Sequence, residues 1–577
     1  MKIKNICRNA AVLGCSALLM TSCASDYLDT PQHGDVDATQ IAKTTDEARA
    51  AMLTVAAGMG RYWQYGGEPQ LGPAQALGQG ETGLGYYLGE IPGQDCYVNF
   101  IYDVAPNWVM FYNQEPMSLN TGDYVWNRPL WMYCYANINQ LNELLAYIDG
   151  AEGSEEVREF TKGQALTLRA HMYFRLLQLY GPRWENSDNG EKLASVVIRT
   201  TPGEPQDKGV SSMNDVLKLI YSDLDAAIES FGKAGNTQRQ ICYEPTLNVA
   251  YGVYARTAAL KHDWATCRDM AHAARQGYRP ATTAEAMSGY LSFNNNEWMW
   301  CPSFEAVDNA IYGNWCTFMA CNSYAAINNK YTNSIDITLY RRLPSTDARR
   351  DWWLTVDKLP GISPAMAYST RAVNEVNQVF VAANLNLAAR TWLDNRQTQY
   401  NIPGERAYSG EGSGTESTSV IRDGAQVKFW VNGLTGQNGT GQIPYMRATE
   451  MYLYEAEACA ELGETTTAQN LLNEINQVHN PSYTCTATGA DLIDEVRLYR
   501  RIELWGEGFC WFDFKRWNLP MQRTAWVEGD RNSGNIPVEL CALVPVTQNN
   551  NWRYAIPRSE RTYNQAITEP IPGEKIE

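Results

Sequence analysis

Residues 212–231, with the sequence SMNDVLKLIYSDLDAAIESF, decide the fold class of this chain. Apolar side chains recur there at intervals of three and four residues, which places them on one face of an α-helix. That face consists of Met213, Val216, Leu217, Ile220, Leu224 and Ile228. A second helical stretch follows at 246–261, so the two segments predict a pair of antiparallel helices joined by a turn.

Similar patterns occur on both sides of this pair. They predict helices at 45–60, 131–148, 154–180, 263–276, 445–462 and 465–478. The helix at 154–180 is stopped by Gly181 and Pro182, which do not continue a helix. Helix pairs of about 30–40 residues with short turns are typical of tetratricopeptide-like repeats, whose stacked pairs form a scaffold.

The helical period is lost from residue 279 to residue 442. Asn, Gly, Ser, Trp and Tyr become common there instead, which indicates a loop-rich subdomain laid over a helical scaffold. Residues 66–127 are also aperiodic and rich in glycine and aromatic residues. We therefore expect the body of the protein, 23–577, to consist of segments 23–278, 279–442 and 443–577.

The first 22 residues predict a signal peptide. Basic residues precede an apolar stretch at 10–20, which is long enough for a secretory signal and too short to span a membrane. Small residues then lead into Cys23, an order that resembles the lipobox of bacterial lipoproteins. Cys23 is therefore expected to become the acylated N-terminus, and its acyl chains would hold the body on a bilayer. The alternative is a plain secreted protein in which Cys23 is incidental.

Charge and composition exclude several classes of function. The net charge of −17 argues against nucleic acid and anionic lipid headgroups as partners. The five histidines form no H-x-x-x-H or H-E-x-x-H pair, so no metal site and no cofactor are expected. The cysteines form no C-x-x-C pair. Those on predicted helix faces are expected to act as small buried apolar residues, and they are Cys134, Cys267 and Cys459.

The segment 500–517, RRIELWGEGFCWFDFKRW, contains three carboxylates among three arginines. A pair of carboxylates is the machinery of a glycosidase, and Glu503, Glu507 and Asp513 supply the residue type. Their alternation with arginines favours ion pairs instead, since opposite charges at this spacing pair with each other and with chain ends. The same structural interpretation applies to the charged residues Asp347, Arg349, Arg447 and Glu450.

Aromatic residues mark a candidate binding surface in two aperiodic regions, around 95–112 and 298–324. Sugars have apolar C–H faces edged by hydroxyl groups, so they need a flat aromatic ring beside amide or acidic side chains. Trp108 and Trp315 each follow an Asn in a predicted loop, whereas Trp298 and Trp300 alternate as in a strand and are expected in the core. The candidate glycan-binding residues are Tyr97, Asn107, Trp108, Tyr112, Asn314, Trp315 and Tyr324.

Several segments, in this order, resemble motifs of the SusD/RagB family of outer-membrane nutrient-binding lipoproteins from Bacteroidetes. They are CASDYLDT at 23–30, KGQALTLRA at 162–170, YGP at 180–182, LPSTDAR at 343–349, YMR at 445–447, YEAEA at 454–458, RRIELWGEGFCWFDFKRW at 500–517 and AIPRSE at 555–560. Two departures stand out. Cys510 occupies a position where a basic residue is usual, so a local ion pair is expected to be lost, and the sequence after Asn564 lacks the usual ending.

The resemblance implies a mostly α-helical fold, in which tetratricopeptide-like helix pairs form a scaffold with a loop-rich ligand-binding subdomain. It implies a surface-exposed lipoprotein of the outer membrane that captures oligosaccharides and performs no catalysis. It also implies delivery to a SusC-like TonB-dependent transporter, on which the protein acts as a hinged lid, and a ligand held by loops of the two aromatic regions. A peptide-binding RagB-like protein and a surface glycosidase remain the alternatives. The aromatic, Asn-rich loops favour sugar over peptide.

The lipid anchor can be tested directly. Replacing Cys23 by Ala is expected to leave a folded but unanchored protein, because the acyl chains lose their attachment atom. Membrane fractionation of cells that produce the variant measures this. If the substituted protein stays in the outer-membrane fraction, a lipid on Cys23 is not its main tether.

Overall fold

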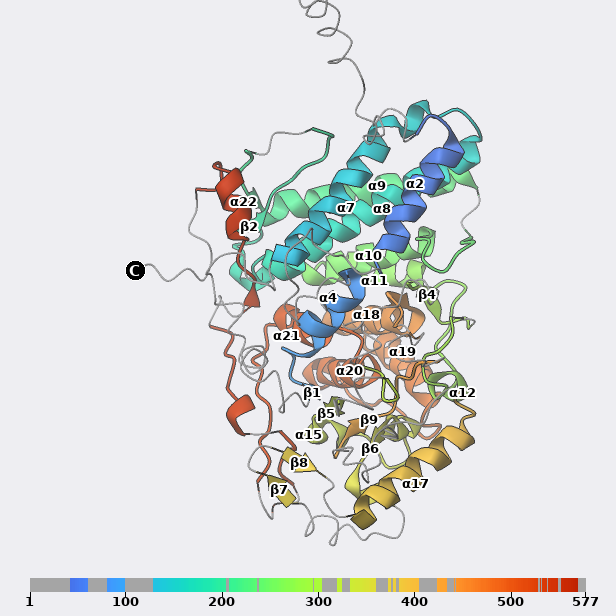
Figure 1. Cartoon of the computed structure of the whole chain (residues 1–577), viewed down its shortest axis with the longest axis vertical. Coiled ribbons are helices and arrows are strands. Elements are labelled where there is room, and N and C mark those ends of the chain that lie inside the picture. The colour runs from blue at the N-terminus through green and yellow to red at the C-terminus, as the bar shows by residue number, and fades with distance from the viewer. Residues whose placement is uncertain are drawn as a thin grey trace, which may run out of the picture.

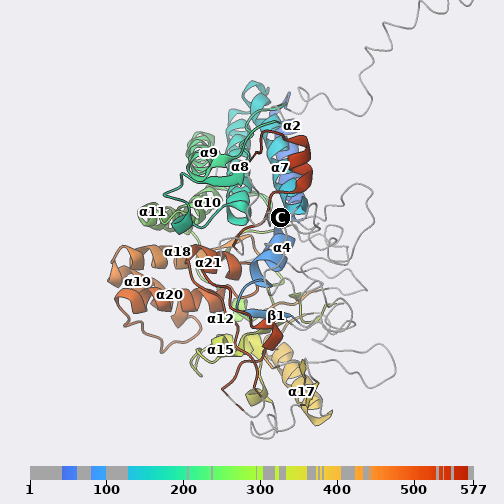
Figure 2. The same cartoon turned by 90° about the vertical axis from the view of Figure 1, so that its left-hand side faces the viewer.

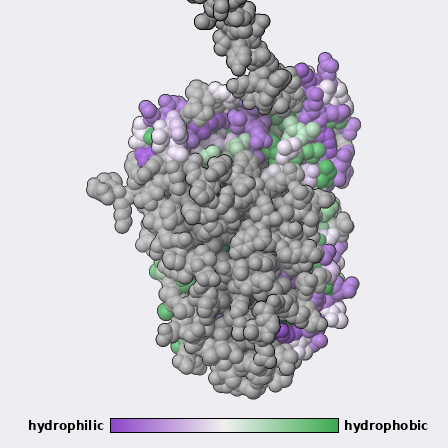
Figure 3. All heavy atoms as spheres, viewed as in Figure 1, coloured by the Kyte–Doolittle hydropathy of each residue, from purple (hydrophilic) through white to green (hydrophobic). Residues whose placement is uncertain are grey.

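The structure, a computed structural model, is mostly helical with several small sheets (Figure 1). It describes residues 42–60, 80–98, 128–203, 207–235, 238–293, 295–302, 319–323, 333–359, 372–374, 377–379, 383–403, 423–432, 441, 443–527, 530, 532–536, 538–547 and 552–568. Within these residues no helix is both long and apolar enough to cross a membrane. The described surface around the upper helices is mainly hydrophilic (Figure 3), in keeping with the acidic composition.

Packed helices make up most of the upper half of the molecule in Figure 1. They are α2 (Thr45–Gly58), α7 (Arg128–Tyr147), α8 (Glu155–Tyr180), α9 (Met213–Ala234), α10 (Leu247–Leu260) and α11 (Trp264–Ala274). The Ser154 side chain caps α8, and Gly181 follows its last residue. In α9 the predicted apolar face is buried, with only Ile228 partly exposed. The predicted pairing of helices is thus confirmed, while its likeness to tetratricopeptide units in particular stays a prediction.

A second group of helices lies below the first and carries the C-terminal motif (Figure 2). It consists of α18 (Ala448–Glu461), α19 (Thr465–Gln477), α20 (Gly489–Glu503) and α21 (Cys510–Arg516). Residues 448–460 of α18 are all buried, and the small side chains of Ala456, Ala458 and Ala460 let α11, α19 and α20 approach it closely. The predicted start at 445 was wrong, because Met446 and Arg447 form a strand instead.

Small antiparallel sheets connect the segments. One sheet has the order β1 (Cys96–Val98), β5 (Asn333–Ile335), β9 (Ala425–Gln426), β6 (Trp353–Leu354). The other pairs are β10 (Met446–Arg447) with β4 (Trp298–Trp300), β2 (Leu193–Val196) with β3 (Ser211–Ser212), and β7 (Ala372–Asn374) with β8 (Asn377–Val379). Trp298 and Trp300 are buried in β4, which confirms their prediction as core residues.

The loop-rich prediction for 279–442 missed one long helix, α17 (Ala383–Gln399). Its buried side chains include Ala389 and Leu393, which join a separate core cluster with β6 and β9. Because few of its residues are strongly apolar, no helical stripe is visible in the sequence. The remaining short helices are α4 (Gly80–Leu84), η2 (Gly85–Glu90), η3 (Ile148–Gly150), η4 (Trp184–Asn186), α12 (Thr283–Ala286), α15 (Ile337–Tyr340), η6 (Ala348–Trp352), η7 (Val356–Lys358), η8 (Val538–Leu540) and α22 (Arg558–Tyr563).

The main hydrophobic core draws on all three predicted segments, from Ala42 to Ile567. The division at 278/279 and 442/443 therefore stays a prediction about the order of elements along the chain. All ten cysteines of the described part are free and nine are buried, as expected for Cys134, Cys267 and Cys459.

A buried carboxyl group lies where η2 meets the C-terminal motif. Glu90 Oε1 accepts hydrogen bonds from the Gly508 and Phe509 amides at 2.9 and 3.3 Å. Within the described residues Glu90 Oε2 has no hydrogen-bond partner. Burial raises the pKa of Glu90 to about 8, and the negative charge of Asp95 adds to this effect. Cys510, at the position of the missing basic residue, lies 3.4 Å from Asp95 Oδ2, while Arg501 pairs with Asp95 at 2.5 Å.

We expect Glu90 to make stability depend on pH. Its pKa is higher in the folded state than in the unfolded chain, so the folded state binds the extra proton. The stability that Glu90 contributes is then fully present below its usual pKa of 4.5 and is lost as pH rises through about 8. Replacing Glu90 by Gln should flatten this loss, which urea unfolding at about pH 5, 7 and 9 measures.

The matched control is Gln at the exposed Glu156, which should leave the pH profile of stability unchanged. An unaltered fall in the unfolding free energy of the Glu90 variant between these pH values would show that another group titrates.

Candidate ligand-binding face

Only one of the predicted binding residues lies in the described part of the chain. The outlying ones are Cys23, Asn107, Trp108, Tyr112, Asn314, Trp315 and Tyr324, and for these the prediction stands untested. Tyr97 lies in the middle of β1, paired with Ser334, and its side chain is 0% exposed. A ring enclosed in the main core offers no face to a sugar, so Tyr97 is corrected to a core residue.

The pairing of β1 with β5 brings both aromatic regions to one edge. Val98, the last residue of β1, pairs with Asn333, the first residue of β5. Because the strands are antiparallel, these two ends lie side by side. Residues 99–127 follow Val98 and residues 324–332 precede Asn333 in the sequence. The stretch with Trp108 therefore begins, and the stretch with Tyr324 ends, at adjacent strand ends, whereas Asn314 and Trp315 precede segment 319–323.

A short segment, 319–323, follows the stretch that contains Asn314 and Trp315 and is bonded to residues 429–431, which lie after β9. The Asn322 amide donates to the Val431 carbonyl, and the Val431 amide donates to Asn322 Oδ1, both at 2.8 Å. The Cys321 amide donates to Phe429 O at 3.0 Å. Asn322 is fully buried. Its side-chain amide satisfies the backbone amide and carbonyl of Val431, so it is assigned a structural role and not a ligand contact. These bonds hold segment 319–323 against residues 429–431.

A buried charge network begins at Lys428, the residue before Phe429. Lys428 Nζ donates to Glu507 Oε1 at 2.7 Å and to the Glu503 and Trp505 carbonyls at 2.8 and 2.9 Å. Glu507 also accepts from Arg447, through Nε at 2.8 Å and Nη2 at 2.9 Å. Arg447 therefore shares Glu507 with Lys428. The predicted ion pairing of the C-terminal motif is confirmed.

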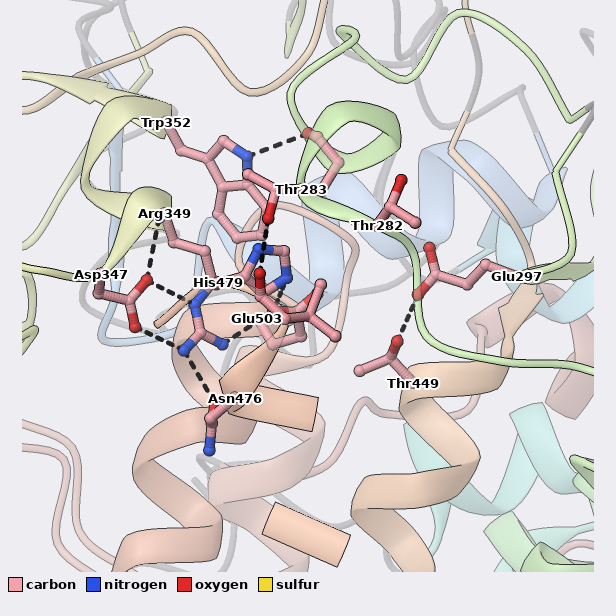
Figure 4. Close-up of polar contacts among 12 residues, drawn as sticks. Thr282, Thr283, Glu297, Asp347, Arg349, Trp352, Thr449, Asn476, His479 and Glu503 are labelled. Atoms are coloured by element: carbon pink, nitrogen blue, oxygen red, sulfur yellow. Dashed lines mark hydrogen bonds and ion pairs between the residues drawn. The ribbon is translucent and has the colours of Figure 1, made fainter. Parts of the chain in front are cut away.

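Arg349 carries the network further, as Figure 4 shows. Its guanidinium lies between Asp347 at 2.7 Å, Asn476 at 2.8 Å and Glu503 at 3.0 Å. Arg447 Nη1 reaches the other oxygen of Glu503 at 3.0 Å. Each carboxylate oxygen of Glu503 thus faces an arginine.

These contacts decide against a catalytic pair of carboxylates. Burial alone would raise the pKa of Glu503, but the positive charge of Arg447, with that of Arg349, holds it well below its usual range. A glycosidase needs a carboxylic acid with a raised pKa that can reach a glycosidic oxygen. Burial does raise the pKa of Glu297, yet Glu297 is only 2% exposed and is bonded to Arg447 and Thr449.

The partner of one predicted pair differs from expectation. Arg447 was grouped with Glu450, but Glu450 pairs with Arg256 at 2.7 Å. Both residues are fully buried and structural. Among the described residues no group of three or more His, Cys, Asp or Glu side chains is placed to hold a metal ion.

One feature of the described part was missed by sequence reasoning. A cavity of about 280 Å³ lies between α7, the segment after β2, and α22. Its lining consists of Trp131, Met132, Tyr135, Ala136, Ile138, Asn139, Asn142, Arg199, Thr201, Gly203 and Glu560. Trp131, Tyr135, Asn139 and Asn142 recur every three or four residues along α7. This mixed stripe of rings and amides, beside the apolar stripe of α7, was the available signal.

Two family models match most of the described chain. A model described as "SusD family" matches residues 301–573, and a model described as "Starch-binding associating with outer membrane" matches residues 82–258. The chain belongs to the SusD family. No curated protein matches it.

Solved structures of the SusD family have the same fold. A SusD-like carbohydrate binding protein from Bacteroides vulgatus ATCC 8482 is 20% identical, with a TM-score of 0.67 over 91% of this chain and 97% of that one. A SusD superfamily protein from Bacteroides thetaiotaomicron VPI-5482 is 17% identical, with a TM-score of 0.64 over 92% and 99%. A SusD-like carbohydrate binding protein from Bacteroides fragilis NCTC 9343 is 17% identical, with a TM-score of 0.60 over 91% and 99%.

The charge network yields a stability prediction for this SusD-family chain. Replacing Arg447 by Met leaves Glu503 and Glu507 buried with fewer positive partners. Breaking one side of a buried ion pair costs about 3–5 kcal/mol, and chemical denaturation should show a loss of this size.

The matched control is Met at Arg268, which is 31% exposed and pairs with Asp269 and Glu464 at the surface. Surface pairs contribute at most about 1 kcal/mol. Equal losses in the two variants would contradict a structural role for the network.

Proposed function

We propose that this SusD-family protein captures oligosaccharides at the outer membrane through an aromatic face. The observation that supports the proposal is the pairing of Val98 with Asn333, which puts the beginning of the stretch that contains Trp108 beside the end of the stretch that contains Tyr324. Two rings with neighbouring amides are the chemistry that a sugar needs, because the rings cover its apolar face and the amides bond its hydroxyls. The description of the matched family model, starch-binding and outer-membrane associating, supports the same ligand class.

The burial of the tryptophans bears on which of them could contact a sugar. No tryptophan of the described part is exposed, since its exposed large apolar side chains are Leu193, Leu462, Val527, Val538, Leu543 and Tyr563. The tryptophans outside the described residues are at positions 63, 108, 126 and 315. The candidates for an open platform are these four and the half-buried Trp184, Trp264, Trp392 and Trp526. Trp108 and Trp315 are the two that follow an asparagine.

The proposal extends to anchoring and delivery. A lipid on Cys23 would hold the body at the outer membrane, and a SusC-like TonB-dependent transporter would receive the oligosaccharide. Both steps rest on the resemblance of the sequence to the SusD/RagB family. No chemistry is assigned to the protein, because Glu503 and Glu507 are bonded to cations.

A peptide ligand, as in a RagB-like protein, is the second candidate. An extended peptide binds chiefly by adding a strand to an open sheet edge. The described strands are only two to four residues long, so they offer little edge for such pairing. This observation and the asparagine-flanked tryptophans favour sugar.

Single replacement of Trp108 or Trp315 by Ala tests the face. Each is expected to weaken oligosaccharide binding by about 1–3 kcal/mol, the effect of losing one aromatic anchor. Thermal melting should change little, because a ring at the surface buries little on folding. Isothermal titration against a panel that begins with starch oligosaccharides, paired with melts of the same variants, gives both quantities.

Ala at the half-buried Trp264 of α11 serves as the control, with unchanged affinity expected. A core tryptophan behaves in the opposite way, since its loss costs about 3–5 kcal/mol of stability. Large drops in melting temperature with unchanged affinity would therefore move Trp108 and Trp315 into the core and reject the face.

A further inference from the structure

The cavity between α7 and α22 has walls that are fixed from behind. Trp131 Nε1 donates to Glu560 Oε2 at 3.1 Å, and its ring lies 4.6 Å from that of Tyr135. The Tyr135 hydroxyl bonds the amide and the carbonyl of Val197 at 2.8 and 2.9 Å. The Trp131 and Tyr135 side chains are thus held in place before any ligand arrives, as a binding site requires.

The charges in the cavity balance. Its charged lining residues are Arg199 and Glu560, which pair at 2.8 Å. The Arg199 guanidinium also lies 5.1 Å from the centre of the Tyr135 ring. An anionic or cationic ligand would have to compete with this pair, whereas a neutral ligand can bond the groups without breaking it.

The cavity also offers polar groups that are free to bind. Asn139 lines it and is exposed, and its amide makes no hydrogen bond within the described residues. Glu560 Oε2 accepts one bond, from Trp131, and a carboxylate oxygen can accept a second. An amide and a carboxylate oxygen beside the half-buried Tyr135 ring can bond hydroxyl groups while an apolar face rests on that ring.

The volume limits the size of the ligand. Pockets for drug-sized molecules measure about 300–1,000 Å³, and this cavity, at about 280 Å³, lies at the small end. One or two sugar rings are of this size, whereas a long oligosaccharide is not.

We propose that the α7–α22 cavity is a second carbohydrate subsite, which takes one or two neutral sugar rings. The inference rests on the proposed function, since it assigns the same ligand class to a different place. The α7–α22 cavity is connected to the predicted aromatic face through the sequence. Residues 99–127, with Trp108, directly precede α7, and Trp131 lies in the first turn of that helix. Figure 2 shows α7 and α22 side by side above β1.

Filling the cavity tests the subsite. Replacing Ala136, which lines it, by Trp should abolish binding of maltose and of methyl glucoside at this site. Replacing Asn139 by Ala should weaken the same binding about tenfold. Trp at Gln140 is the matched control, because Gln140 is exposed on the same helix and does not line the cavity. Saturation-transfer NMR and titration measure binding, and thermal melts confirm that each variant is folded.

The outcomes separate this inference from the proposed function. If the wild type binds oligosaccharides and the Ala136 and Asn139 variants bind both probes as well as it does, the subsite is rejected and the aromatic face remains. If the wild type binds no member of the panel, both proposals fail. Glucuronic acid, a charged probe, should bind more weakly than methyl glucoside, and tighter binding would overturn the assignment to neutral sugars.

Discussion

Arg447 is the contact on which the rest of the structure depends. Its guanidinium bonds Glu297, Glu503 and Glu507, which lie 150, 56 and 60 residues away in the sequence. These residues precede β4, end α20 and follow α20, respectively. A buried guanidinium without partners would cost several kcal/mol, so the fold must bring all three segments to one point. The strand pair β4–β10 and the start of α18 are placed by the same contact.

The charges around Arg447 also explain why the network is stable without being reactive. Arg349, Arg447 and Lys428 face four carboxylates, those of Asp347, Glu297, Glu503 and Glu507. The excess is a single negative charge. Burial raises the pKa of Glu297, while Arg447 acts against this shift. A network balanced in this way holds chain segments together and leaves no carboxylate free to attack a ligand.

The sequence predicted structure that depends on neighbouring residues, and it missed structure that depends on contacts between residues far apart in the chain. Helices α8 and α9 carry an apolar stripe together with a capping serine, so periodicity located them within about three residues. Helix α17 lacks a stripe and escaped, because its packing against β6 and β9 comes from residues far away in the chain. Pairing of charges in the C-terminal motif was predicted, yet the partners of Arg447 were not, since residue spacing says nothing about contacts across 150 positions.

Distant contacts also decided two outcomes for the candidate binding residues. Tyr97 was predicted to be open and is buried, and the α7–α22 cavity was not predicted at all. Residue type alone could not separate a buried ring from an open one, and Tyr97 is buried because its strand packs into the main core. The cavity was hidden for the reverse reason, since Glu560 completes it from the far end of the chain. In both cases a side chain gains its role from a neighbour that only the fold supplies. The buried charges around Arg447 hold the segments that supply such neighbours in place.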